Sequence, residues 1–255
     1  MRWDAGLYDE QNRTRVEAGL KLIAKAAIGP EEKVLDIGCG TGTLTAEMAR
    51  LAHKGRVVGL DPSEDMLAMA RAKASPFGNI VLIQGRAEEM SFSSEFSLAY
   101  SSNALQWVID QDAAVKNIYS ALEPGGRLAV QMPSSGFSNA LIDCIRQAME
   151  DIGRREDFHL PWYLPEREEY EEVLHKAGFR GTRVRYEDRP MTFRSSSDAL
   201  DWALSAALVP YMNLLGWREG EYFKYAVAMN FERYRSGQDI VCDFRRLIAH
   251  AHKPH

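Results

Sequence analysis

Residues 34–45 read V-L-D-I-G-C-G-T-G-T-L-T, and this stretch limits the possible folds more than any other part of the chain. Its apolar residues predict a buried strand, and the glycines at alternate positions predict a tight turn that opens directly into a helix. Glycine allows positive φ and lets a ligand approach the backbone, while the free N–H groups of the following helix favour an anionic or polar group. The pattern predicts a binding turn; a strand-turn-helix without a ligand is the alternative.

Two common nucleotide-binding patterns fit this turn poorly. The dinucleotide fingerprint G-x-G-x-x-G requires a third glycine where this chain has Thr43. A P-loop requires lysine at the end of the turn, and no lysine stands between Asp36 and Lys54. The fit to a dinucleotide site is therefore weak, and the chain has no P-loop at this position.

The remaining pattern is D-x-G-x-G-x-G, from Asp36 to Gly42, and it resembles motif I of the class I S-adenosylmethionine-dependent methyltransferases. The resemblance implies S-adenosyl-L-methionine as cofactor. It also implies an α/β fold: a doubly wound, Rossmann-like, seven-stranded and mostly parallel sheet. In this family the turn, here with Gly38, Cys39 and Gly40, holds the methionine end of the cofactor. The cofactor carboxylate suits helix N–H groups, and its ammonium suits Asp36.

Length and charge set the class of protein. A chain of 255 residues, 45% hydrophobic and 26% charged, fits one sizeable soluble domain, or a domain with an insertion, better than two independent domains. The net charge of −5 does not predict a surface for nucleic acid or anionic membrane, although it leaves room for a local basic patch. We expect no nucleic-acid partner and no membrane association.

The cysteines and the apolar runs indicate the compartment. Cys39, Cys144 and Cys242 form no C-x-x-C pair, which favours reduced thiols and a cytoplasmic protein over a disulfide framework or a zinc site. The polar N-terminus has no signal-peptide pattern, and no run reaches the length of a membrane span.

A second acidic residue follows the next predicted strand, Gly55 to Leu60. Asp61 stands about 20 residues after the glycine turn, where a carboxylate accepts hydrogen bonds from ribose hydroxyls. It therefore supports a nucleoside without choosing between NAD and S-adenosylmethionine, and the resemblance adds Pro62 and Met66 as neighbours of the cofactor. Asp61 also suits the start of the next helix, and the two roles are compatible if Ser63 serves as the cap.

The third predicted strand, Asn79 to Gln84, is followed by G-R-A-E-E-M-S-F, which resembles the family's G-D-A-x-x-L-P-F. In the family the aspartate meets the adenine amine, but here Arg86 replaces it, and a guanidinium only donates. Either the backbone around Arg86 and Ala87 contacts adenine, with Glu88 nearby, or Arg86 stacks on the purine.

The fourth predicted strand, Phe96 to Ser102, ends in polar residues. The carboxyl ends of parallel strands are where ligands bind, so we expect Ser102 and Asn103 near the cofactor and Gln106 and Trp107 at the reaction centre. The alternative is a helix start, with Asn103 as its cap and Trp107 in the core. The absence of [N/D]-P-P-[Y/F] and of a Pro-Cys nucleophile disfavours nucleobase substrates.

The flanking segments complete the expected domain. The helix around Val16–Ala27 follows a polar approach in which Tyr8 either folds over the cofactor or simply packs. After a helix at 112–122, L-x-P-G-G leads into the fifth strand, Arg127–Met132, and helices at 140–149 and 168–177 lead to a strand at Thr182–Tyr186. The last strand, Phe244–His252, is expected to run antiparallel. We expect residues 1–193 and 238–255 to form the cofactor-binding core, and residues 194–237, rich in aromatic side chains, to form an inserted helical substrate cap.

Several further stretches look like the trans-aconitate 2-methyltransferase group: S-S-N-A-L-Q-W-V, A-V-Q-M-P, Phe158–Tyr163 and D-W-x-x-x-x-x-L-x-P-Y. The similarity to malonyl-carrier-protein and juvenile-hormone-acid methyltransferases is more distant. This resemblance implies O-methylation of a small-molecule acid by in-line displacement. A carboxylate is ionised near pH 7 and needs donors rather than a base. The candidates are Gln106, Trp107, Tyr211, Tyr8 and Arg218, while His159 is the candidate base if the acceptor is a phenol or an amine.

Other functions remain as alternatives. An NAD-dependent oxidoreductase is permitted by Asp61 and opposed by Thr43, and a non-catalytic S-adenosylmethionine-binding regulatory subunit would share the same turn. The C-terminal H-x-H-x-x-H has no carboxylate or cysteine beside it, so we expect no metal site. The pattern does not define the oligomeric state.

Overall fold

The computed structural model describes residues 3–255, which fall into two compact units. The larger, which we call the sheet unit, comprises residues 13–135, 162–187 and 246–255. The smaller, which we call the helix-rich unit, comprises the described residues up to Asn12 together with 136–161 and 188–245. The predicted insertion, residues 194–237, lies inside the helix-rich unit, which extends beyond it. Its role as a substrate cap stays a prediction.

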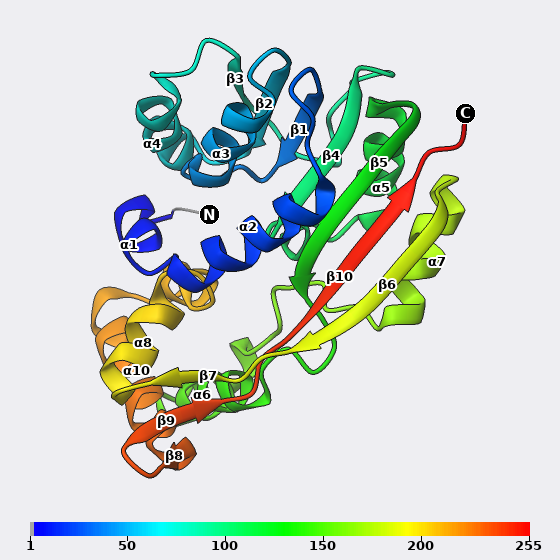
Figure 1. Cartoon of the computed structure of the whole chain (residues 1–255). Coiled ribbons are helices and arrows are strands. Elements are labelled where there is room, and N and C mark those ends of the chain that lie inside the picture. Colours follow the sequence, from blue (N-terminus) through cyan, green and yellow to red (C-terminus); the bar gives the residue numbers. More distant parts are fainter. Residues whose placement is uncertain (1–2) are drawn as a thin grey trace. The chain divides into compact units, whose positions relative to one another are not determined.

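The sheet unit is built on one seven-stranded sheet with the order β3-β2-β1-β4-β5-β10-β6, which can be followed in Figure 1. Its strands are β1 (Lys33–Ile37), β2 (Arg56–Asp61), β3 (Ile80–Gln84), β4 (Phe96–Ser102), β5 (Leu122–Pro133), β6 (Arg180–Asp188) and β10 (Arg245–His252). Strands β1 to β5 pair in parallel, and β10 runs antiparallel to β5. The predicted fold class and the antiparallel last strand are confirmed.

Helices of the sheet unit cover both faces of the sheet. They are α2 (Arg13–Ala26), α3 (Thr43–Leu51), α4 (Glu64–Ala74), the short η1 (Leu105–Trp107), α5 (Gln111–Ala121) and α7 (Arg167–Ala177). Leu22 of α2 and Met48 of α3 pack with Val34 and Leu98 on one face. A sheet buried on both faces requires continuous apolar strands, which explains why β1 and β4 read as apolar runs in the sequence.

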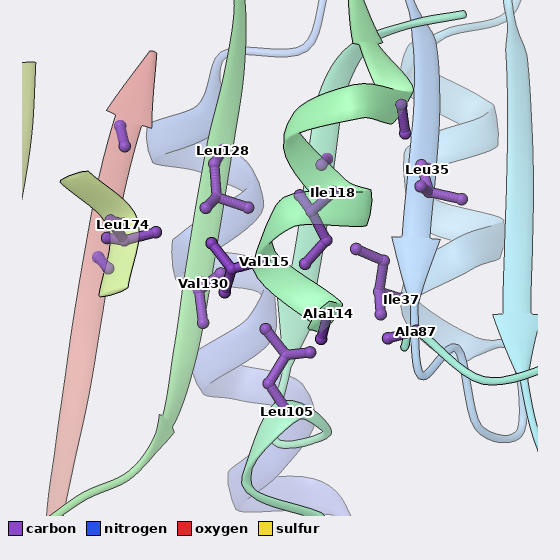
Figure 2. Close-up of a cluster of buried hydrophobic side chains, with 14 of the residues drawn as sticks. Leu35, Ile37, Ala87, Leu105, Ala114, Val115, Ile118, Leu128, Val130 and Leu174 are labelled. Atoms are coloured by element: carbon purple, nitrogen blue, oxygen red, sulfur yellow. The ribbon is translucent and has the colours of Figure 1, made fainter. Parts of the chain in front are cut away.

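The core on the other face of the sheet is formed around α5. Figure 2 shows Ala114, Val115 and Ile118 of this helix lying between Leu128 and Val130 of β5 and the side chains of β1. Val115, Ile118 and Leu35 are completely buried. This packing fixes the ends of β1 and β4 relative to one another, and those ends carry the predicted site.

The helix-rich unit contains α1 (Ala5–Glu10), α6 (Asn139–Asp151), η2 (Arg155–Asp157), α8 (Ser196–Leu204), α9 (Val209–Leu214), α10 (Trp217–Phe231) and η3 (Glu232–Tyr234). A three-stranded sheet joins β7 (Met191–Phe193), β9 (Asp239–Cys242) and β8 (Arg235–Ser236) in antiparallel pairs. Helix α10 buries Phe223, Val227 and Phe231 and packs against α6 and α8. Neither this small sheet nor α1, which Asp4 caps by accepting from the Leu7 N–H, was predicted.

Within residues 3–255, none of the helices combines the length and the apolar character that a membrane span requires.

Candidate functional site

The glycine turn between β1 and α3 has the conformation that its sequence predicts. Gly38, Gly40 and Gly42 have φ angles of 73°, 54° and 80°, and Gly42 is the N-terminal cap of α3. A Cβ added to Gly38 would lie 2.1 Å from the Cβ of Ala104. Positive φ and this close approach both require glycine, so the turn tolerates no side chain at position 38.

Backbone and carboxylate contacts tie this turn to the end of β2. The N–H groups of Gly38 and Cys39 donate to the Leu60 carbonyl at 2.7 and 3.1 Å. The Gly40 N–H donates to Asp61 Oδ2 at 2.9 Å, and the Ser63 N–H donates to Asp61 Oδ1 at 2.9 Å. A carboxylate offers about four acceptor positions, so Asp61 is held in one orientation and keeps capacity for a ligand.

Ser63 caps α4, as predicted, because its Oγ accepts from the Met66 N–H at 3.3 Å. Pro62 connects the Asp61 carboxylate to this cap, and Met66 is buried directly after it. The hydrogen bond from the Gly40 N–H to Asp61 brings this segment next to the glycine turn. The cofactor contacts expected for Pro62 and Met66 stay predictions.

Asp36 lies at the base of the turn and is 2% exposed. Its Oδ2 accepts a hydrogen bond from Thr45 Oγ1 at 2.6 Å. Burial raises the pKa of Asp36 to about 7, the Thr45 hydrogen bond opposes this shift, and the charge of Asp61 adds to it. Burial also raises the pKa of Asp61, against the two N–H donors. Two partly desolvated carboxylates at one turn favour a cationic ligand.

Cys39 lies in the turn, and Lys73 contacts the turn from α4. Cys39 is buried, and burial, followed by the charges of Asp36 and Asp61, raises the pKa of its thiol well above the usual range. Lys73 of α4 donates to Thr41 Oγ1 at 3.2 Å and to Thr43 Oγ1 at 2.7 Å, and so links α4 to the turn. A lysine on an amphipathic helix gives no signal of this contact in the sequence.

Helix α5 stabilises the loop after β3 through hydrogen bonds. Asn117 Nδ2 donates to the carbonyls of Ala87 and Glu88 at 3.2 and 2.9 Å. The Arg86 side chain is 57% exposed and lies 3.5 Å from Glu88 Oε1. Ala87 is buried, so the loop presents backbone and the Arg86–Glu88 pair rather than the carboxylate of the family pattern.

The end of β4 carries a cluster of amide and hydroxyl groups. Asn103 has a φ of 56°, an uncommon conformation for a residue with a side chain and one that clusters at functional sites. Ser102 Oγ accepts from Gln131 Nε2 at 2.8 Å and from Asn103 Nδ2 at 3.2 Å. Gln106 Nε2 donates to the Asn103 carbonyl at 3.0 Å.

Gln106 carries an unused acceptor. The residue is 5% exposed, and its Oε1 is buried without a hydrogen-bond partner among residues 3–255. Native proteins rarely leave such an atom unpaired, so it points to a missing donor. Next to it Trp107 packs edge-to-face on Trp162, with ring centres 6.0 Å apart, and is only partly buried. The Tyr163 N–H donates to the Gln106 carbonyl at 2.8 Å and fixes this corner.

The helix-rich unit brings two predicted residues together. The Tyr211 hydroxyl donates to the His159 carbonyl at 2.6 Å, and Phe158 stacks on the Tyr211 ring. Tyr211 is 1% exposed, and burial raises the pKa of its hydroxyl. A phenol has one proton to donate, and here it is engaged by the backbone. The exposed His159 ring places Nδ1 3.0 Å from the Asp157 carbonyl.

The other two candidates of this unit are found on its surface elements. Tyr8 lies on α1 and packs edge-to-face with Trp3, at 6.2 Å between ring centres. Arg218 is exposed in the first turn of α10. The roles expected for Tyr8, His159, Tyr211 and Arg218 stay predictions.

No group of three or more His, Cys, Asp or Glu side chains within the described part of the chain is arranged to hold a metal ion. The predicted absence of a metal from the histidine-rich C-terminus stays a prediction.

Known proteins resemble the chain in both sequence and fold. Residues 34–126 match the family description of a methyltransferase domain. The trans-aconitate 2-methyltransferase of Deinococcus radiodurans is 29% identical, and the match covers 100% of this chain and 99% of that protein. The chain is an S-adenosylmethionine-dependent methyltransferase. Sequence similarity therefore decides against the oxidoreductase alternative.

Solved structures show the same fold. A phosphoethanolamine N-methyltransferase of Haemonchus contortus, bound to S-adenosylhomocysteine, aligns with a TM-score of 0.61 and 22% identity over 94% of this chain and 53% of that one. The YcgJ protein of Bacillus subtilis aligns with a TM-score of 0.63 and 16% identity over 94% and 99% of the two chains.

The residues of this methyltransferase fit its cofactor. The turn at Gly38 has no side chain that would exclude a ligand from the backbone, and Asp61 is oriented with acceptor capacity left over. Asp36 is a buried carboxylate for which a cation is the natural partner. A sulfonium nucleoside with ribose hydroxyls and an amino-acid end supplies each of these complementary groups.

Proposed function

We propose that this methyltransferase transfers a methyl group to a carboxylate oxygen of a small-molecule acid similar to trans-aconitate. The observation that carries the proposal is the match to the Deinococcus enzyme, which extends over the full length of both chains. The match therefore includes the helix-rich unit, in addition to the cofactor-binding sheet that unrelated methyltransferases share.

The cofactor contacts that we propose follow from the geometry of the sheet unit. Asp61 accepts from the ribose hydroxyls, and Asp36 pairs with the ammonium of the amino-acid end. Gly38, Cys39 and Gly40 contact that end through their backbone, and the carbonyl and N–H groups around Ala87 contact adenine, with Arg86 over its face. S-Adenosylmethionine supplies an electrophilic methyl group on a positively charged sulfur.

The acceptor that we propose matches the groups at the end of β4. Ser102, Asn103, Gln106 and Trp107 do not ionise near pH 7, so they can orient an acceptor but cannot take its proton. A carboxylate needs no proton removed. The reaction is an in-line displacement, and correct orientation of the acceptor oxygen can supply up to about 7–11 kcal/mol of the barrier.

A transfer assay on a panel of acceptors tests the proposal. The protein is incubated with S-adenosylmethionine labelled in the methyl group and with trans-aconitate, tricarballylate, a phenol or an amine. We expect label in a product of the acids that mild base releases as methanol, the behaviour of a methyl ester. Label only in base-stable ethers or methylamines would overturn the proposal, as would tight binding of S-adenosylhomocysteine without transfer to any acceptor.

A substitution at Gln106 tests whether this residue binds the acceptor acid. Gln106→Ala should raise the KM for the acid, and Gln147→Ala, in which the changed glutamine lies on α6, is the matched control. Equal KM values for the two variants would remove Gln106 from the acceptor site.

We also propose that the enzyme works in the cytoplasm. The cysteines of the described chain are unpaired and buried, which suits a reducing compartment. Nucleic acids are not among the substrates that we propose.

A further inference from the structure

Five basic side chains share one surface of the sheet unit. Arg183 and Arg185 lie on β6, His250 and His252 on β10, and Lys25 on the adjoining α2. Four of them are exposed, and His250 is partly buried. We call this surface the basic face.

Strand geometry places the basic face on the α2 side of the sheet. Residues at alternate positions of a strand point to the same face. Arg183 and Arg185 therefore share one face of β6, and His250 and His252 share one face of β10. His250 stands opposite Ala129, which packs in the same core as Leu22 of α2.

The basic face is separate from the cofactor turn. The strand register runs Asp36, Tyr100, Ala129, His250 across β1, β4, β5 and β10. Three strand spacings of about 4.8 Å put His250 about 14 Å from the Asp36 strand. A ligand on the basic face would therefore not occupy the methyl-transfer site.

The positive charges of this face are not neutralised. Among residues 3–255, none of the five side chains forms an ion pair or a hydrogen bond. The Glu187 carboxylate of β6 is already engaged, since its Oε2 lies 3.5 Å from Nε of Arg246. Burial, and then Lys25, Arg185, His252 and Arg183, lowers the pKa of His250. An uncompensated positive field on a chain of net charge −5 favours an acidic partner.

The basic face borders an open sheet edge. Strand β6 is the last strand of the seven, so its outer N–H and C=O groups face no further strand of the described chain. Charged residues on edge strands also prevent aggregation, and Arg183 and Arg185 suit that role. His250 and His252 do not suit that role, because they lie on β10, the second strand from the edge. A positive charge there only adds repulsion between the basic side chains.

We propose that the basic face binds an extended acidic segment of a partner protein, which adds to the outer edge of β6 as a further strand. Carboxylates at alternate positions of such a strand repeat every 6.6–6.8 Å or so, as do the side chains of Arg183 and Arg185, and cross-strand pairs of opposite charge stabilise a sheet. Strand addition supplies main-chain hydrogen bonds, and the arginines supply selectivity. A second copy paired through this part of β6 would set arginine against arginine, which disfavours a dimer there.

Peptide binding to the full-length protein tests the proposal. The probes are a nine-residue peptide of alternating Glu and Thr, the same peptide with Lys in place of Glu, and the Glu peptide with alternate backbone nitrogens methylated. We expect the Glu peptide to bind, and to bind less tightly as salt is added. The Lys peptide and the methylated peptide should bind at least about tenfold more weakly.

Charge-reversed variants locate the site. R183E/R185E should weaken Glu-peptide binding about tenfold or more, while R13E/R71E, with the same change in net charge on exposed arginines elsewhere in the sheet unit, should not. Both variants should retain S-adenosylhomocysteine binding, which separates this test from that of the methyl-transfer site. Equal affinity for the methylated and unmethylated Glu peptides, or tighter binding of poly-U or of phosphatidylserine vesicles, would overturn strand addition. If the Glu peptide does not bind, the proposal is also overturned. Arg183 and Arg185 would then serve only to prevent aggregation at the edge strand.

Discussion

The Asp61 carboxylate accepts a hydrogen bond from the Gly40 backbone N–H at 2.9 Å, and so joins the end of β2 to a turn 21 residues earlier in the chain. Its other oxygen accepts from the Ser63 N–H at the start of α4. One buried side chain therefore orders both the turn after β1 and the helix after β2. The position that the sequence pattern assigns to a ribose contact also holds the turn in shape.

Replacing Asp61 should affect stability and cofactor affinity together. Asp61→Ala leaves two backbone N–H groups without their acceptor, which should lower the free energy of unfolding by about 2–4 kcal/mol. S-Adenosylhomocysteine affinity should fall more than tenfold, or about 1.4 kcal/mol. Asp61→Asn keeps one acceptor oxygen, so its stability and its affinity for S-adenosylhomocysteine should lie between those of the wild type and Asp61→Ala. Denaturant unfolding and calorimetry measure both effects; full affinity in Asp61→Ala would contradict the assignment.

Asp36 should make the unliganded protein less stable as the pH rises. Its pKa is about 7 in the folded chain, against 3.8 for an ordinary aspartate, so the folded state holds a proton that the unfolded state has released between these values. The stabilisation present below about pH 4 is lost as the pH rises to about 7, by the order of 2–4 kcal/mol.

Asp36→Asn removes this titration and supplies the comparison. The variant should gain stability relative to the wild type between about pH 4 and 7, while its affinity for S-adenosylhomocysteine falls. Thermal unfolding of both proteins across this range is the measurement. A stability difference that does not change with pH would show that Asp36 ionises normally.

Thr45 should act as a positioning residue for Asp36. Its hydroxyl donates to Asp36 Oδ2 at 2.6 Å and stabilises the ionised form. In Thr45→Val, stability should continue to fall up to a higher pH before it becomes constant, because the pKa of Asp36 rises without this hydrogen bond. Thr45→Ser should restore the wild-type pH dependence. If Thr45→Val and Thr45→Ser behave alike, the hydroxyl plays no part in the titration.

Gly38 should tolerate no side chain. A Cβ at this position would meet Ala104 at 2.1 Å, and the φ of 73° adds backbone strain. Gly38→Ala should lower the free energy of unfolding by about 3 kcal/mol or more, whereas Gly78→Ala, where nothing lies within 4 Å of the added atom, should change it by less than about 1 kcal/mol. Comparable unfolding midpoints for the two variants would refute the packing of the turn.

Tyr211 should stabilise the segment that carries His159. Tyr211→Phe removes the 2.6 Å hydrogen bond to the His159 carbonyl and should cost about 0.5–1.5 kcal/mol of stability. We expect a higher KM for the acid acceptor and an unchanged affinity for S-adenosylhomocysteine. Unchanged stability would mean that this hydrogen bond is not formed in solution.

Local patterns predicted the sheet and the turn because each depends on neighbouring residues. The glycines at 38, 40 and 42 dictate their own φ angles, Ser63 caps the helix that follows it, and the apolar runs of β1 and β4 define buried strands. The antiparallel β10 was found because a fold of this class requires a last strand and residues 244–252 offered one.

Contacts between distant residues were not predictable in the same way. Thr45 and Asp36 are nine residues apart, and Lys73 lies 30 residues from Thr43, so nothing in either local sequence marks the pair. The strands of the small sheet, such as the two-residue β8, are too short to give a period. The extent of the helix-rich unit likewise depends on which helices pack together. The amphipathic α6 is one case, because it packs against α10 although it precedes the predicted insertion.

Isothermal titration calorimetry of the purified protein with S-adenosylhomocysteine, and separately with NAD, tests the central assignment most directly. We expect one site per chain for S-adenosylhomocysteine, lost or greatly weakened in Asp61→Ala, and no heat with NAD. Binding of NAD with equal affinity, or no heat with S-adenosylhomocysteine, would contradict the assignment of the turn to S-adenosylmethionine.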